Sequence, residues 1–136
     1  MKIEILRKKL KIIFKKYKLS SAHSKICTEA IINAELVGAH SHGLSRVKMY
    51  CDRISKKIIN PKPKIKIKKI SQSVSHIDAN NSIGFVAADL GIKIAIKHAQ
   101  KTGIGMVAIK GSGHYGLSGY YAEQAVKKNF SIHISY

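Results

Sequence analysis

The stretch IGMVAIKGSGHYGLSGYYAEQAVKK, residues 104–128, decides the fold, because an apolar run, a glycine-rich loop and a helix-like segment follow one another directly. The apolar run predicts a strand over 105–110, and the segment after the loop predicts a helix over 118–128. The next segment, FSIHIS at 130–135, is predicted as a strand buried inside the same sheet. Together the three elements form a right-handed βαβ unit.

The loop at 111–116 reads G-x-G-x-x-G, the pattern of a dinucleotide-binding turn. That fingerprint needs an acidic residue at the end of the following strand, about 20 residues further on. The last acid of the chain is Glu123, inside the predicted helix, so the pattern fails this requirement. His114 makes the loop a candidate for acid–base chemistry, although helix capping or packing under the loop would explain this histidine equally well.

Working outward from the loop, the remaining chain predicts a helical half followed by strands and a long helix. A Pro/Lys-rich segment near residue 61 separates the two parts. Ser20 or Ser21 is the expected N-cap of the second helix, and Gly38 its stop. The predicted helices cover 3–17, 19–38, 45–57 and 85–101; the predicted strands cover 64–70 and 73–79, with a turn at 80–84. We predict an α/β fold, with an N-terminal helical hairpin packed on a mixed sheet and crossover helices, distinct from the Rossmann fold.

Composition narrows the class of protein. The chain has 136 residues, 45% of them hydrophobic, which suffices for one folded domain. We find neither a membrane-length apolar run nor a signal peptide, and the two cysteines, Cys27 and Cys51, fit neither a disulfide framework nor a metal site. We therefore predict a cytoplasmic protein that binds no membrane.

The net charge of +18 favours a nucleic-acid partner at first sight. Only three of the 25 basic residues are arginine, however, and isoleucine is as abundant as lysine, as an A/T-rich genome would produce. Specific recognition of nucleic acid favours arginine and interleaved aromatic side chains. We expect no specific nucleic-acid binding; the alternative is a non-enzymatic basic protein or gene remnant that binds nucleic acid non-specifically.

A second motif, AHSHGLSR at 39–46, also carries chemistry. His40 and His42 lack a third ligand at diagnostic spacing, so we predict no metal site. His42 could instead donate a proton, and Arg46, one helical turn before Tyr50, could clamp a carboxylate with its planar guanidinium. Together they suit a 2-keto acid, although a surface helix would also explain Arg46.

The order and spacing of the SHG and GHYG motifs, with DANNSIG and GIG between them, resemble the malate/L-lactate dehydrogenase family, which includes ureidoglycolate dehydrogenase and diketogulonate reductase. The resemblance implies an oxidoreductase that uses NAD or NADP to interconvert a 2-hydroxy acid and its 2-keto acid. It implies acid–base roles for His42 and His114, without dividing their duties. The positions that it associates with substrate binding are Ser41, Arg46 and Tyr50.

Members of this family continue well past the matched part. The resemblance therefore implies that residues 1–136 are the N-terminal portion of a single domain, with a helical segment at 1–60 and the start of the α/β part at 61–136. It places the cofactor-binding residues mostly beyond Tyr136, so these remain unknown. We expect the 136-residue chain to be a truncation without activity of its own, and the full-length protein to form a homodimer.

Overall fold

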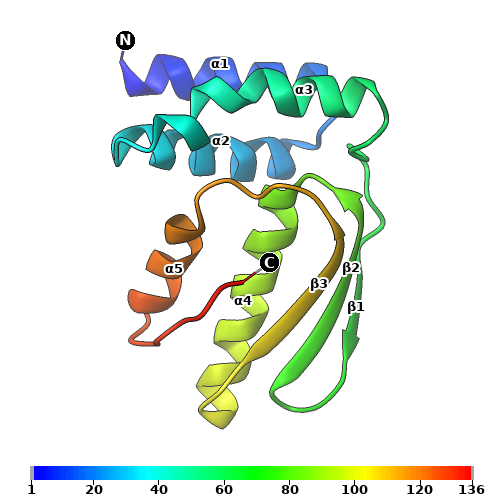
Figure 1. Cartoon of the computed structure of the whole chain (residues 1–136), viewed down its shortest axis with the longest axis vertical. Coiled ribbons are helices and arrows are strands. Elements are labelled where there is room, and N and C mark those ends of the chain that lie inside the picture. The colour runs from blue at the N-terminus through cyan, green and yellow to red at the C-terminus, as the bar shows by residue number, and fades with distance from the viewer. Residues whose placement is uncertain (1, 136) are drawn as a thin grey trace.

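The structure, a computed structural model, describes residues 2–135 and has an α/β architecture (Figure 1). A layer of three helices lies against a second layer that contains a three-stranded sheet and two further helices. In chain order the elements are α1 (Ile3–Lys16), α2 (Ser21–Leu36), the 3₁₀ turns η1 (His40–His42) and η2 (Leu44–Arg46), α3 (Val47–Ser55), β1 (Lys66–Lys69), β2 (Val74–Ser82), α4 (Gly84–Thr102), β3 (Met106–Ser112) and α5 (Ser118–Val126).

The first two helices form the predicted hairpin. Leu10 and Phe14 are buried on the inner face of α1, at the helical spacing visible in the sequence. The side chain of Ser20 accepts a hydrogen bond from the backbone N–H of His23, which makes it the N-cap of α2. Arg7 on α1 holds the carboxylate of Glu29 on α2 with three N–H···O contacts of 2.9–3.1 Å. These contacts fix the two helices side by side.

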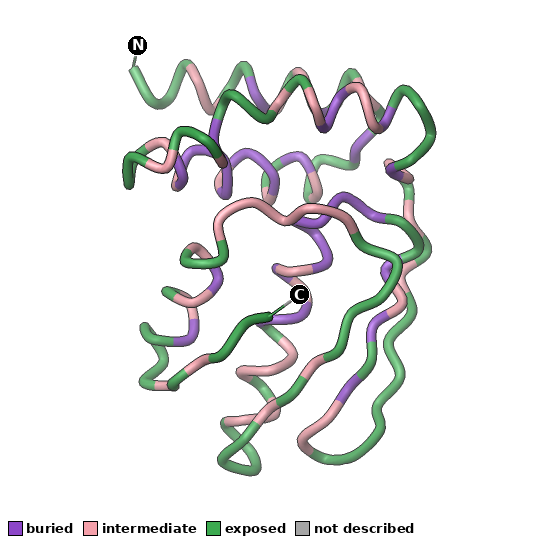
Figure 2. Tube along the Cα trace, viewed as in Figure 1, coloured by how far each residue is buried: buried purple, intermediate pink, exposed green. Residues whose placement is uncertain are grey.

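The sheet is mixed, in the order β1-β2-β3, with β1 antiparallel and β3 parallel to β2. Helix α4 packs on one face of β2 and β3. The predicted turn at 80–84 is partly wrong, since β2 continues to Ser82, but Asn80 and Asn81 both have positive φ and the register with β3 shifts there. The buried residues gather where the helical layer meets the first half of α4 (Figure 2).

The predicted strand at 130–135 is wrong. This segment is extended but pairs with no strand, and it runs beside α5 and across α4 (Figure 1). Phe130 and Ile132 pack on a cluster formed by Ile92 of α4 and Tyr121 of α5, whereas the alternate residues are exposed. The apolar side of this segment therefore packs on the surface of two helices. This packing holds the segment without backbone hydrogen bonds to a neighbouring strand.

Candidate active site

Two loops from opposite halves of the chain meet at the junction of the layers. One contains η1 and η2 and carries His42; the other joins β3 to α5 and carries His114. The imidazole rings of the two histidines stack, with centroids 5.6 Å apart and an angle of 26° between the planes. The structure thus brings together the two histidines that the sequence suggested for acid–base chemistry.

Tyr50 connects His114 to the helical core. The Tyr50 hydroxyl group lies 2.7 Å from Nδ1 of His114. The Tyr50 ring is completely buried and packs at 4.8 Å, centroid to centroid, against Phe85 at the start of α4. Burial raises the pKa of Tyr50, so the side chain remains a neutral phenol that can donate its proton to the imidazole nitrogen.

A second donor fixes the protonation of His114. The backbone N–H of Gly116 points at the same Nδ1 atom, at 3.2 Å. Because a backbone N–H can only donate, Nδ1 carries the lone pair and the neutral ring carries its proton on Nε2. Burial lowers the pKa of His114, and the nearby His42, Arg46 and Arg53 lower it further. His114 is therefore poised as a neutral ring with an Nε2–H donor.

Ser41 and Arg46 complete the group. Ser41 Oγ lies 3.0 Å from Nδ1 of His42, and the Ser41 carbonyl oxygen accepts a hydrogen bond from Arg46 Nε at 2.8 Å. Arg46 lies in the turn η2, so the predicted helix begins two residues later than expected, and its side chain is exposed whereas Tyr50 is buried. With Nε occupied, the Nη1–Nη2 end of the guanidinium is the part that can receive a carboxylate.

One glycine of the 111–116 loop, Gly116, is required by packing. A Cβ atom on Gly116 would lie 2.5 Å from Cε1 of Phe85, and Gly116 has a φ of +80°. Gly84, at the start of α4, allows a similarly close approach, since its Cβ would lie 2.3 Å from the carbonyl oxygens of Gly113 and His114. The loop is therefore pressed onto α4 and presents His114.

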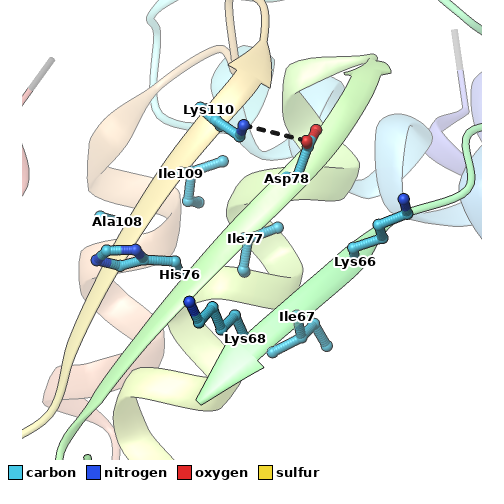
Figure 3. A pocket seen from close by; sticks show the side chains of 9 residues that line it. All are labelled: Lys66, Ile67, Lys68, His76, Ile77, Asp78, Ala108, Ile109 and Lys110. Atoms are coloured by element: carbon cyan, nitrogen blue, oxygen red, sulfur yellow. Dashed lines mark ion pairs between the residues drawn. The ribbon is translucent and has the colours of Figure 1, made fainter. Parts of the chain in front are cut away.

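Two hollows of the surface lie elsewhere. One, of about 410 Å³, lies on the outer face of the sheet between Lys66, His76 and Lys110, where Lys110 pairs with Asp78 at 3.3 Å (Figure 3). Another, of about 460 Å³, lies between the ends of α1 and α3. Neither is lined by His42 or His114. Within the described part of the chain, no three His, Cys, Asp or Glu residues are grouped to hold a metal ion, and no helix is long and apolar enough to cross a membrane.

Sequence reasoning missed several residues that shape this site. Glu35, near the end of α2, accepts a hydrogen bond from the backbone of Leu44, beside the histidine motif. Phe85 and Gly84 form the surface on which Tyr50 and the second loop rest. The contacts of Phe85 and Gly84 join distant parts of the chain, and the carboxylate of Glu35 reaches nine residues ahead to Leu44, so no helix or strand pattern predicts them. Only the glycines in NNSIG and GSGHYG indicated a close approach of backbone.

The comparisons with known proteins decide the family. Residues 1–135 match the family model described as malate/L-lactate dehydrogenase. The chain belongs to the malate/L-lactate dehydrogenase family. This confirms the resemblance seen in the motifs. The mixed sheet with its helices confirms the predicted α/β class.

Among its relatives in this family, the malate/(S)-sulfolactate dehydrogenase of Methanothermus fervidus is 39% identical over 82% of the chain and 33% of the relative. The NAD⁺-dependent ureidoglycolate dehydrogenase of Escherichia coli K12 is 36% identical over 82% of the chain and 32% of the relative. The solved malate dehydrogenase of Pyrococcus horikoshii superposes with a TM-score of 0.89 at 34% identity, over 93% of this chain and 36% of that one. The chain thus spans about a third of the length of the curated relatives that it matches.

Proposed function

We propose that this chain supplies the proton-transfer and carboxylate-binding groups of a dehydrogenase that interconverts a 2-hydroxy acid and its 2-keto acid with NAD or NADP. The stacked pair of His42 and His114, with Arg46 tied to the residue before His42, carries the proposal. Malate, sulfolactate and ureidoglycolate, which name the relatives, are all 2-hydroxy acids. Their shared group is a carboxylate beside a carbinol carbon, which matches one guanidinium and one proton-transfer pair.

The two histidines receive different duties in this proposal. The neutral His114 donates a hydrogen bond from Nε2–H to the substrate oxygen and polarises the carbonyl group, because Tyr50 and Gly116 occupy its other nitrogen. His42, whose Nδ1 faces Ser41, delivers or removes the proton through Nε2. The family resemblance associates Tyr50 with substrate binding. In this proposal Tyr50 instead holds the His114 ring through its hydrogen bond to Nδ1.

Arg46 receives the substrate carboxylate at its Nη1–Nη2 end, beside the Ser41 hydroxyl. When bound, a nicotinamide cofactor would supply or accept the hydride. From the family resemblance we expect the residues that bind the cofactor mostly in the remainder of such a dehydrogenase, and we assign none of residues 2–135 to this role. Because hydride transfer depends on positioning both reactants, we expect residues 1–136 alone to show neither turnover nor saturable NADH or NADPH binding. Homodimer formation likewise stays a prediction from the resemblance.

Binding can be tested on the chain itself. Oxamate, a stable analogue of a 2-keto acid, should shift the ring signals of His42 and His114 in an NMR titration of residues 1–136. Arg46→Lys should weaken this binding, because lysine offers one point charge in place of two parallel donors. Equal shifts with a polyphosphate, or none with oxamate, would favour a non-enzymatic basic protein over this proposal.

Catalysis can be tested after grafting residues 1–136 onto the remaining two thirds of the Pyrococcus abyssi malate dehydrogenase, which is 42% identical over 105 residues. His42→Ala and His114→Ala should each lower turnover by roughly 10²-fold or more, as expected when a proton-transfer group or a hydrogen-bond donor to the developing oxyanion is lost. Arg46→Lys should mainly raise KM for the keto acid. Normal kinetics in both histidine variants would contradict the assignment, and micromolar NADH binding by residues 1–136 would show that the cofactor site lies within them.

A further inference from the structure

Glu35, near the C-terminal end of α2, holds the turn that carries the first histidine. Its Oε1 atom accepts a hydrogen bond from the backbone N–H of Leu44 at 2.7 Å, and its Oε2 atom pairs with Nδ1 of His40, also at 2.7 Å. His40 begins η1 and Leu44 begins η2. One carboxylate on a helix therefore holds both 3₁₀ turns, and His42 is the last residue of the first turn.

Gly43 shows how closely the carboxylate fits. A Cβ atom at this position would lie 2.0 Å from Oε1 of Glu35, so only glycine leaves room for it. Two further hydrogen bonds close the turn on itself, from Ser45 Oγ to the His40 carbonyl and from Arg46 Nε to the Ser41 carbonyl. Among these ties, those of Glu35 join the turn to α2.

The place of Glu35 in its helix argues against a role in stabilising that helix. α2 ends at Leu36, so Glu35 lies in the last turn, where the helix dipole disfavours a negative side chain. Its hydrogen bonds run forward into the turn at 40–46. The carboxylate stays ionised at neutral pH, since the Leu44 N–H and then His40 lower the pKa of Glu35.

We propose that Glu35 is a positioning residue: it fixes the turn at 40–46 so that His42 stacks on His114 and Arg46 lies beside them. The inference rests on the proposed function only where it calls the positioned groups catalytic. The positional statement concerns the chain alone and needs neither substrate nor cofactor.

The test is an NMR titration of the histidine rings in residues 1–136. The charged groups facing His114 are His42 and Arg46 on the turn and Arg53 on α3, and Tyr50 contacts its ring. Glu35→Ala should let the turn move away, so the His114 pKa should rise toward its ordinary value and ring contacts between His42 and His114 should vanish. Amide exchange at Leu44 should accelerate about tenfold or more, because a charged hydrogen bond is lost.

Three variants separate positioning from general stability. Glu35→Gln keeps an oxygen for the Leu44 N–H and an amide for His40, so it should restore the wild-type His114 titration. Glu29→Ala removes the other paired carboxylate of α2, which binds Arg7 of α1 and does not contact the turn at 40–46. This variant should lower the melting temperature without changing the His114 titration. Gly43→Ala displaces the carboxylate without removing it and should reproduce the Glu35→Ala shifts.

An unchanged His114 titration in a folded Glu35→Ala variant would overturn the proposal. If Glu35→Ala does not fold, Gly43→Ala decides, and wild-type ring contacts in that variant would overturn the proposal equally. None of these measurements uses a keto acid or NADH, so failure of the dehydrogenase assignment would show in the oxamate titration and leave these results unaffected.

Discussion

The hydroxyl group of Tyr50 lies 2.7 Å from Nδ1 of His114, although the two residues are 64 positions apart in the chain. Tyr50 belongs to α3 in the helical layer, and His114 belongs to the loop between β3 and α5. One partly buried hydrogen bond therefore links the two layers at the candidate site.

Tyr50→Phe should remove this link with little change of shape. We expect a loss of about 0.5–1.5 kcal/mol in the free energy of unfolding, measured by urea denaturation, because the bond is partly buried. The His114 ring signals should shift as well. Ser75→Ala is the control, since it removes a hydrogen bond to His98 between β2 and α4, away from the site, and should cost stability without moving His114. Equal effects of both variants on His114 would contradict a direct contact.

Stability should fall as the pH drops below the ordinary histidine range. Burial lowers the pKa of His23 and of His114 in the folded chain, whereas in the unfolded chain both titrate near 6.5. Below that pH the unfolded chain binds more protons, so acid favours unfolding; above it both states are neutral and the penalty is absent. Glu35 and Asp78 also have lowered pKa values in the folded chain, but protonation of these carboxylates reduces stability only at more acidic pH.

Urea unfolding at about pH 7.5 and about pH 5.5 measures this effect, since the interval brackets the ordinary histidine pKa. The free energy of unfolding should be lower at the acidic end, and His114→Gln should reduce the difference. A pH dependence that is unchanged in this variant would show that His114 titrates alike in both states.

Gly84→Ala should push the second loop away from α4. Its new Cβ would lie 2.3 Å from the carbonyl oxygens of Gly113 and His114, so backbone must move, at a cost of about 1–3 kcal/mol. Gly119→Ala, in α5, meets its nearest neighbour at 3.9 Å and should stabilise the chain by about 0.5 kcal/mol. Denaturation curves that rank the two variants in the opposite order would refute the close approach.

The segment after α5 should behave as a packed extended strip. Phe130→Ser should cost about 1 kcal/mol through lost apolar burial against Ile92 and Tyr121, whereas His133→Ala, on the exposed side, should cost little. Hydrogen exchange distinguishes this arrangement from the strand expected from the sequence. Slow exchange of the amides at 131–135 in the monomer would show that the segment pairs after all.

Local pattern was enough to find most helices and strands. The spacing of Leu10 and Phe14 predicted the first helix, and Gly103 predicted the end of α4. The order of the SHG and GHYG motifs predicted the family, which the family match confirms. The predictions that failed, and the residues that were missed, depend on packing between elements, which a local sequence pattern does not specify. The alternation in FSIHIS matches a strand and a helix-packed strip equally well, and nothing near Glu35 in the sequence says that its carboxylate reaches Leu44.

The contact between Tyr50 and His114 has a consequence for the order of folding. The α1–α2 hairpin and the β2–α4–β3 unit are built from neighbouring segments, and such contacts can form early. The stacked histidines need the closure of a loop of more than sixty residues, so we expect them to come together only after both layers have docked. The candidate site would then exist only in molecules that have completed their folding, and a partly folded chain would hold two separate imidazoles and no site.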